Sequence, residues 1–579
     1  MLAQWVMVLG FVVFAYLVVR RPFQSDPSVQ NLAVLIDLLI ATLSTGIAAA
    51  SVRSGRSWVI FSAHLVVAGF LVRLIPSLIL SLPPYQDPYP YFSTFLIAWR
   101  SKSFSPTSFS WFKATPAELH WPLLQSLTVE IRAWTGMSLT DLIILVPPAL
   151  GALTCVAASL VAYSVYRSWR TAAIAGLLVS FTDVVIFYQS EYHPQGVALL
   201  TFSLLIYLIL ESRAALRLGA SILTLLVAGA FLLTHHASAL VVPLVLLPLL
   251  AIPFLARLVT TYGSEGWLAR FKLREMLKDL DMGPFERLVP IVLLLVVCGL
   301  SMQIFLSNSI LLLVVHQFDR GGLPIANAST GTSLWLLLLR FGKYLLLPIS
   351  FVGLFLSARR MDAKRLILLV LAVGLAAASA PALATGSTSI DRIISFWALF
   401  ASVLAAFGLT RWLPGALGIR RWAGALAVGA IAIYSSLGIL DAQIPAFYLS
   451  HTPRVRGLFY GNALPNSRSI ALAGHWVRYH IPRTAYVDTD FATRVGVFFF
   501  GRIPFNQAIY TPLRVPWRDY CKASYVVVDP AMDRGFDMPG PVPINYSGYA
   551  RIYDNGSVVV YQRQRGQTCT FNPLARPKH

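Results

Sequence analysis

The chain has 579 residues, of which 57% are hydrophobic and only 12% are charged, which excludes a soluble globular protein for most of its length. The formal net charge of +21 resembles that of nucleic-acid-binding proteins. In a membrane protein, however, Lys and Arg are distributed between the two faces of the bilayer. We therefore expect membrane lipids, and no nucleic acid, as partners.

Apolar runs long enough to cross a bilayer recur from Leu2 to Asp441 and then stop. They predict a mainly α fold, a polytopic bundle of about 13 helices, since each span needs roughly 20 residues. The bundle occupies residues 1–445, and a small extracytoplasmic α/β domain follows in residues 446–579. The predicted spans are 2–19, 31–51, 57–82, 139–163, 171–188, 194–210, 218–234, 237–256, 288–306, 333–357, 366–384, 392–410 and 423–441.

Alternate loops carry most of the Lys and Arg residues, and such loops face the cytoplasm. The N-terminus is therefore predicted to be cytoplasmic and the C-terminal domain extracytoplasmic, in a multi-pass cell-membrane protein. The pair Arg20 and Arg21 runs against this rule. The loops predicted to be cytoplasmic are 51–57, 164–171, 211–217, 257–287, 358–365 and 411–422.

The longest outer connection, 83–138, is where function is expected on a membrane scaffold. Its apolar stretch 92–99 is too short to cross the bilayer, so it predicts a helix in the plane of the interface.

The tail predicts a small α/β domain. An amphipathic segment at 466–480 indicates a helix, and the Asn555-Gly556 turn between β-rich runs indicates a hairpin over 551–561. Cys521 and Cys569 both lie in this tail, and we expect them to be bonded or close enough to bond. Further strands are predicted at 484–488, 495–500 and 524–528.

Charged residues inside the predicted spans gather near the outer end. Asp37 and Arg73 predict a structural ion pair. Arg340, Lys343 and Arg392 lie on the outer side, against the charge rule, and indicate an anionic ligand such as a phosphate. Arg100, in the long outer loop, joins this predicted phosphate-binding set.

Acids and histidines are predicted on the same side. Asp87 lies in the long outer loop, and Asp183 lies near the turn between the fifth and sixth spans. Carboxylates and imidazoles that face one cavity could act as general bases or hold a divalent metal such as Mg or Mn. The candidate metal ligands are Asp87, Glu191, His193, His235 and His236.

With these residues in place, the chain resembles the GT-C superfamily of membrane glycosyltransferases, in particular its archaeal members. The likeness implies a GT-C-like fold and transfer of a sugar, with inversion, from a polyprenyl-phosphate donor to a glycan, lipid or protein acceptor outside the cell. It also implies that Asp87 is the catalytic base or a metal ligand and that Arg392 contacts the donor phosphate. The stretches that carry it are Gln86–Phe92, Trp121–Leu124 with Thr135–Leu139, Ser190–Gln195 and Asp391–Phe396.

Two other functions use the same residues. A transporter or flippase would pass an anionic lipid or solute along the intramembrane charges, but no paired interrupted helices are visible in the sequence. A catalytically inactive scaffold with the GT-C fold is also possible, because Asp87 lacks a second acid beside it.

Overall fold

A computed structural model describes the chain in several stretches that fall into two compact units, one helical and one C-terminal. The two units are described separately below. The described residues are 7–13, 27–80, 122–211, 218–234, 238, 246–248, 283–306, 345–359, 362–385, 389–416, 421–436, 467–489, 493, 497, 501, 508–510, 523–528, 548–556 and 558–564.

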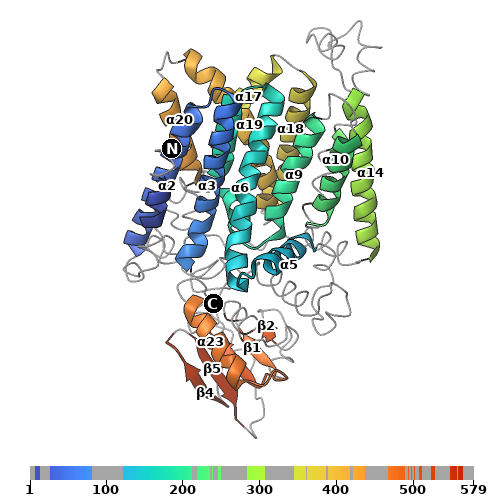
Figure 1. Ribbon diagram of the computed structural model, residues 1–579. Helices are drawn as coiled ribbons and strands as arrows, with labels where there is room; N and C mark the ends of the chain where they lie inside the picture. The colour runs from blue at the N-terminus through green and yellow to red at the C-terminus, as the bar shows by residue number, and fades with distance from the viewer. Residues whose placement is uncertain are drawn as a thin grey trace, which may run out of the picture. The chain divides into compact units, whose positions relative to one another are not determined.

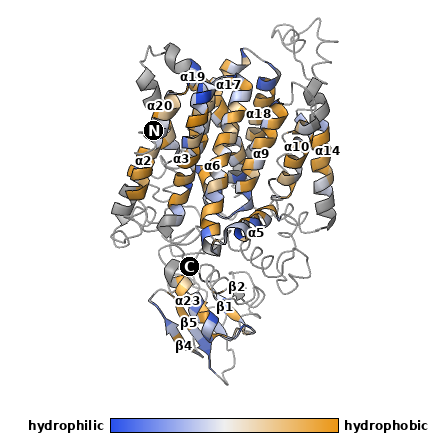
Figure 2. Cartoon of the chain, viewed as in Figure 1, coloured by the Kyte–Doolittle hydropathy of each residue, from blue (hydrophilic) through white to orange (hydrophobic). Residues whose placement is uncertain are grey.

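Long helices make up the helical unit (Figure 1), and Figure 2 shows that apolar residues predominate in the coloured parts of most of them. Helix α19 is its centre, since the apolar stretch Arg392–Arg411 is 89% buried whereas Gly55–Ser77 is only 50% buried. The helices are α2 (Pro27–Ala50), α3 (Gly55–Leu80), α5 (Leu123–Thr135), α6 (Leu139–Tyr166), α7 (Trp169–Ser180), α8 (Asp183–Ser190), α9 (Pro194–Glu211), α10 (Leu218–Leu232), α14 (Gly283–Leu306), α17 (Leu346–Ala358), α18 (Ala363–Thr385), α19 (Ser389–Ala416) and α20 (Arg421–Ser436).

Several of these helices are suited to crossing a bilayer. Among the described residues, four are long and apolar enough, and α7 with α8 would be a fifth if the pair is one bent span. The protein is therefore a multi-pass membrane protein, as predicted. The total of about 13 spans involves residues outside the described ranges and stays a prediction.

The predicted span 171–188 is broken. Helix α7 ends at Ser180, α8 begins at Asp183, and the two are bent by 63°. Thr182 between them has extended backbone angles, and the amide of Val184 donates to Asp183 Oδ1 (2.6 Å), which satisfies one of the free amides at the new helix start. Hydropathy continues across the break, so an apolar run alone does not reveal it.

Helix α5 was not predicted, because its segment was assigned to the long outer loop. It contacts α6 and α9 and runs across their ends rather than along them (Figure 1). It ends at Gly136, whose left-handed φ of 66° suits a residue without a side chain, and the Gly136 amide donates to Arg132 O.

The expected ion pair between Asp37 and Arg73 is not formed. Both side chains are buried, but Arg73 donates to Gln189 and to backbone carbonyl oxygens instead. The carbonyls at the helix break, which the sequence does not reveal, take the place of the predicted carboxylate.

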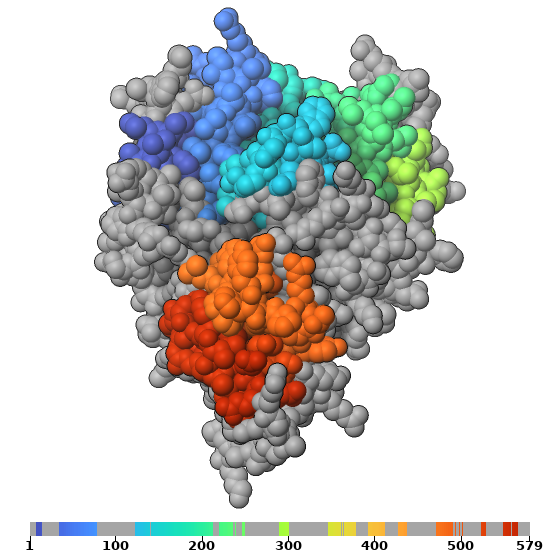
Figure 3. Space-filling model, turned by 60° about the horizontal axis from the view of Figure 1, so that its bottom comes forward, coloured from blue at the N-terminus to red at the C-terminus, as the bar shows by residue number. Residues whose placement is uncertain are grey.

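The C-terminal unit is a five-stranded mixed sheet of order β2-β1-β3-β5-β4 with one helix, α23 (Ser467–His480), against it (Figure 1). In the space-filling view, the orange residues, which include α23, lie directly against the red residues of the last strands (Figure 3). Ile470, Ala473 and Val477 of α23 pack on Val558 and Val560. The strands are β1 (Val487–Thr489), β2 (Ala508–Tyr510), β3 (Tyr525–Val528), β4 (Tyr549–Asp554) and β5 (Val559–Arg563). Strand β1 is parallel to β2 and β3, whereas β5 is antiparallel to β3 and β4.

Most of the predicted tail elements are confirmed. The helix 466–480 is α23, and the hairpin turns at Asn555-Gly556, where Gly556 has φ 86°. The strand predicted at 495–500 is wrong at Val497, which is helical, and β2 was missed. Cys521, Cys569 and the domain boundary near 445 lie outside the described residues.

Candidate active site

Two of the predicted site residues lie in the turn that joins α8 to α9. Glu191 and His193 are both 2% exposed there, and Arg392 lies half-buried in the first turns of α19. Asp391 belongs to the same helix start. The remaining predicted site residues, namely Asp87, Arg100, His235, His236, Arg340 and Lys343, lie outside the described residues.

His193 caps α9 with its imidazole ring. The backbone amide of Gln195 donates to His193 Nδ1 (3.1 Å), and Pro194 occupies the first helical position, where its missing N–H costs nothing. Because Nδ1 accepts this bond, the ring hydrogen of the neutral imidazole is on Nε2. His193 therefore offers a hydrogen-bond donor on its other edge.

The side chain of Gln195 links the start of α9 to the start of α19. Its Nε2 donates to Arg392 O (3.1 Å) and to Ser395 Oγ (2.8 Å), and Ser395 Oγ donates to Arg392 O (2.7 Å). This Gln195 link brings Arg392 next to the turn that carries His193, although the two are far apart in sequence. The sequence analysis missed Gln195 and Ser395 as functional residues, even though both lie in the stretches that carry the resemblance.

The turn is also fixed from the side of α5. Tyr192 is fully buried and its hydroxyl donates to Thr128 Oγ1 (2.8 Å), which donates in turn to Leu124 O (2.7 Å). The amide of Leu123 donates to Leu233 O (3.1 Å), at the end of α10 and two residues before His235. Gln125, also on α5, is fully buried, and neither of its amide atoms has a hydrogen-bond partner.

Charges of both signs meet at this place. The starts of α9 and α19, joined by the Gln195 link, each contribute about half a positive charge from the helix dipole, and Arg392 adds a full one. The Glu191 carboxylate lies in the same turn. A phosphate group is the anion that this arrangement of donors would suit best.

Of the five candidate metal ligands, Glu191 and His193 lie in the described part of the chain. No group of three or more His, Cys, Asp and Glu side chains in the described part of the chain could hold a metal ion. Glu191 has a suitable carboxylate, but His193 presents N–H rather than a lone pair at Nε2, since Gln195 occupies Nδ1. A metal-bound imidazole uses one ring nitrogen as ligand and donates from the other. In this arrangement His193 does not fit as a metal ligand.

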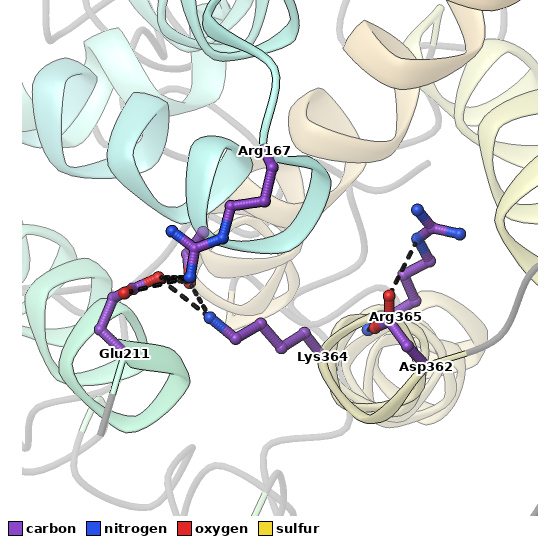
Figure 4. Close-up of polar contacts among 6 residues, drawn as sticks. Arg167, Glu211, Asp362, Lys364 and Arg365 are labelled. Atoms are coloured by element: carbon purple, nitrogen blue, oxygen red, sulfur yellow. Dashed lines mark hydrogen bonds and ion pairs between the residues drawn. The ribbon is translucent and has the colours of Figure 1, made fainter. Parts of the chain in front are cut away.

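A second polar cluster lies at the other end of α9 (Figure 4). Glu211 accepts from Lys364 Nζ (2.9 Å) and Ser164 Oγ (2.5 Å) and forms an ion pair with Arg167 (3.0 Å). Helix α9 has 18 residues, which separates its ends by about 27 Å. Arg167, Glu211 and Lys364, which come from three loops that the charge pattern assigns to one face of the membrane, do meet at this end of α9.

Removal of the carboxylate at this second cluster tests its structural role. In Glu211→Gln, the buried ammonium of Lys364 loses its counter-charge, and we expect a loss of about 2 kcal/mol in stability, discounted because Glu211 is partly exposed. Thermal unfolding in detergent measures the loss, and adding Lys364→Met should recover most of it. Asp362→Asn is the matched control, because the Asp362 side chain in the Asp362–Arg365 pair of Figure 4 is 44% exposed and the pair should contribute little. An unchanged melting temperature for Glu211→Gln would contradict the role.

No protein-family model and no curated protein matches the sequence. Solved structures do match. AglB, the oligosaccharyltransferase of Archaeoglobus fulgidus in complex with an inhibitory peptide and a dolichol-phosphate, is similar with TM-score 0.53 and 16% identity over 87% of this chain and 75% of that chain. ArnT from Cupriavidus metallidurans bound to undecaprenyl phosphate has a TM-score of 0.52 and 13% identity, over 89% of this chain and 99% of that chain. The Archaeoglobus fulgidus oligosaccharyltransferase in complex with Zn and sulfate has a TM-score of 0.51 and 14% identity, over 86% of this chain and 73% of that chain.

Both neighbours are GT-C superfamily membrane glycosyltransferases, so the resemblance stated from the sequence is confirmed. The likeness defines the class of protein, a multi-pass membrane protein with the GT-C fold. At these identities it establishes the fold and leaves the reaction to be argued from the residues.

Proposed function

We propose that this protein is a membrane glycosyltransferase, which transfers a sugar from a polyprenyl-phosphate donor to an acceptor on the outer face of the membrane. The observation that carries the proposal is the Gln195 link, which joins two helix starts, Arg392 and the His193 turn into one anion-attracting place. The fold supports it, because its solved neighbours bind dolichol-phosphate and undecaprenyl phosphate.

The reaction is an inverting displacement. The carboxylate of Asp87 takes the proton of an acceptor hydroxyl, whose oxygen forms a bond to the anomeric carbon. The bond from that carbon to the phosphate oxygen breaks, and the lipid phosphate leaves with the electron pair. Arg392 stabilises the charge of the leaving phosphate, together with the Nε2–H of His193 and the predicted cations Arg100, Arg340 and Lys343.

The test uses the purified full-length protein in proteoliposomes with radiolabelled polyprenyl-phosphate sugars and a cell-envelope extract as the source of acceptors. We expect label to move from lipid to acceptor. In Arg392→Ala, donor binding should weaken by about tenfold to a hundredfold, as expected for loss of a charge-assisted hydrogen bond. Arg411→Ala is the matched control, because Arg411 is exposed at the opposite end of α19 and should not affect binding.

The transporter reading has one structural observation in its favour. Helices α7 and α8 form an interrupted span, and discontinuous helices are common at transporter binding sites. The same proteoliposomes distinguish the two functions. Movement of intact labelled donor across the bilayer without transfer would favour a flippase, and neither activity would favour an inactive scaffold.

A further inference from the structure

The break between α7 and α8 requires partners for its backbone, because α7 ends inside the helical unit with carbonyl groups that have no intrahelical donor. Where water is absent, each such group must be satisfied by protein. Thr182 Oγ1 donates to Leu178 O (2.7 Å), and Ser180 Oγ donates to Gly176 O (2.9 Å). Leu178 O also accepts from the Phe181 amide (3.2 Å). The last two carbonyls of α7, those of Val179 and Ser180, need donors from another helix.

Arg73 of α3 supplies the donors for these last two carbonyls. Its Nη1 lies 3.3 Å from Ser180 O, and its Nη2 lies 3.4 Å from Val179 O. Nη1 also donates to Gly69 O (3.0 Å). A cation at a helix C-terminus is favourable because the dipole is negative there. Arg73 thus caps α7.

The same guanidinium also holds α8. Arg73 Nε donates to Gln189 Oε1 (2.8 Å), and Gln189 Nε2 donates to Thr154 Oγ1 of α6 (2.8 Å). One side chain is therefore bonded to the helix before the break and to the helix after it. Gln189 lies two residues before Glu191, at the end of α8 that leads into the candidate active site.

The packing around Arg73 leaves room for this arrangement only because a neighbour is glycine. A Cβ on Gly151 would overlap Arg73 Cδ and lie 2.5 Å from Nε and 2.8 Å from Gln189 Cβ. Arg73 is fully buried, and no carboxylate contacts it among the described residues. Burying a cation in this way is costly, and a side chain needed only to fill space would not carry a charge.

We propose that Arg73 is a positioning residue that fixes the bend between α7 and α8 and so sets the orientation of the Glu191–His193 turn next to Arg392. The proposal rests on the proposed function for its catalytic consequence, but its structural consequence does not need activity. Arg73→Met removes the donors at nearly the same volume, Arg73→Lys keeps the charge without the fork, and Gly151→Ala displaces the guanidinium while leaving Arg73 in the chain.

The structural test is hydrogen exchange of the full-length protein in detergent, read by mass spectrometry. In Arg73→Met, amides in 179–195 should exchange about tenfold faster or more, while the other helices keep their wild-type rates. Gly151→Ala should show the same pattern, and Arg73→Lys a smaller change. Glu211→Gln is the control of comparable instability at the other end of α9. Unchanged exchange in 179–195, or a uniform rise over the whole helical unit, would overturn the proposal.

The catalytic test separates kcat from KM in the transfer assay. A turn displaced by about 1 Å should lower kcat roughly a hundredfold in Arg73→Met, with partial recovery in Arg73→Lys and little change in KM for the donor. Glu211→Gln should leave the kcat of the folded fraction unchanged. An unchanged kcat in Arg73→Met would overturn the positioning role. If the wild type shows no transfer, the proposed function fails, and the exchange pattern alone decides whether Arg73 fixes the bend.

Discussion

Replacing Asp87 with Asn is expected to lower the rate of sugar transfer by about 10²- to 10⁴-fold, the usual contribution of a general base. The amide keeps the size of the carboxylate but cannot take a proton from the acceptor hydroxyl. Donor binding should change little, because the proposed function assigns the donor phosphate to cations and not to Asp87. The measurement is transfer of label under saturating donor, with donor binding followed in parallel.

Asp362→Asn serves as the control for this substitution, since Asp362 lies two residues before Lys364, whose cluster is at the opposite end of α9 from His193, and its side chain is 44% exposed. Its Oδ1 accepts from the Arg365 amide, a bond that an Asn oxygen can also accept. If Asp87→Asn retains more than about a tenth of the wild-type rate, far above the expected range, Asp87 is not the base, and the carboxylate of Glu191 is the next candidate to test.

The second large effect is expected from Gly353→Ala, at the crossing of α17 and α19. A Cβ on Gly353 would overlap the carbonyl of Leu404, and a Cβ on Gly408 would lie 3.0 Å from the Gly353 amide nitrogen. The two backbones are therefore in direct contact, as small residues allow in membrane helices. We expect a loss of about 3 kcal/mol, at the upper end for overpacking, because backbone cannot move aside as a side chain can.

Gly374→Ala is the matched control in α18, where a Cβ would meet nothing within 4 Å. That substitution should be neutral or stabilising by up to about 1 kcal/mol, because alanine is the better helix former. Thermal unfolding in detergent compares the two variants. Equal melting temperatures for Gly353→Ala and the wild type would mean that α17 and α19 do not cross this closely.

The helices and the hairpin could be predicted from the sequence because their signals are local. A run of apolar residues marks a membrane helix wherever it packs, and Asn555-Gly556 favours one kind of turn on its own. The bend between α7 and α8 could not be predicted in this way. Its carbonyls accept hydrogen bonds from Arg73, more than a hundred residues earlier, and the hydropathy pattern does not show which distant residue supplies these donors.

The candidate site was predicted only in its charged members. Glu191, His193 and Arg392 were identified because they are ionisable, and an ionisable residue in or beside a membrane span is costly unless it has a function or a partner. Gln195 and Ser395, which hold these residues together, are neutral and common in membrane helices, so no such signal marks them. His193 was predicted as a candidate metal ligand from its residue type and its predicted side of the membrane, neither of which shows which ring nitrogen is already occupied.

The Gln195 link also fixes the order in which the site can be assembled during synthesis. Gln195 and Arg392 are 197 residues apart. At ribosomal rates of ~5–20 residues per second, Arg392 is therefore synthesised roughly 10 to 40 s after Gln195. During that interval α9 is already made, but α19, the buried centre of the helical unit, has not yet entered the membrane. The candidate site therefore cannot form before α19 is inserted, and a chain truncated ahead of Ser389 would contain Glu191 and His193 without the helix that completes their surroundings.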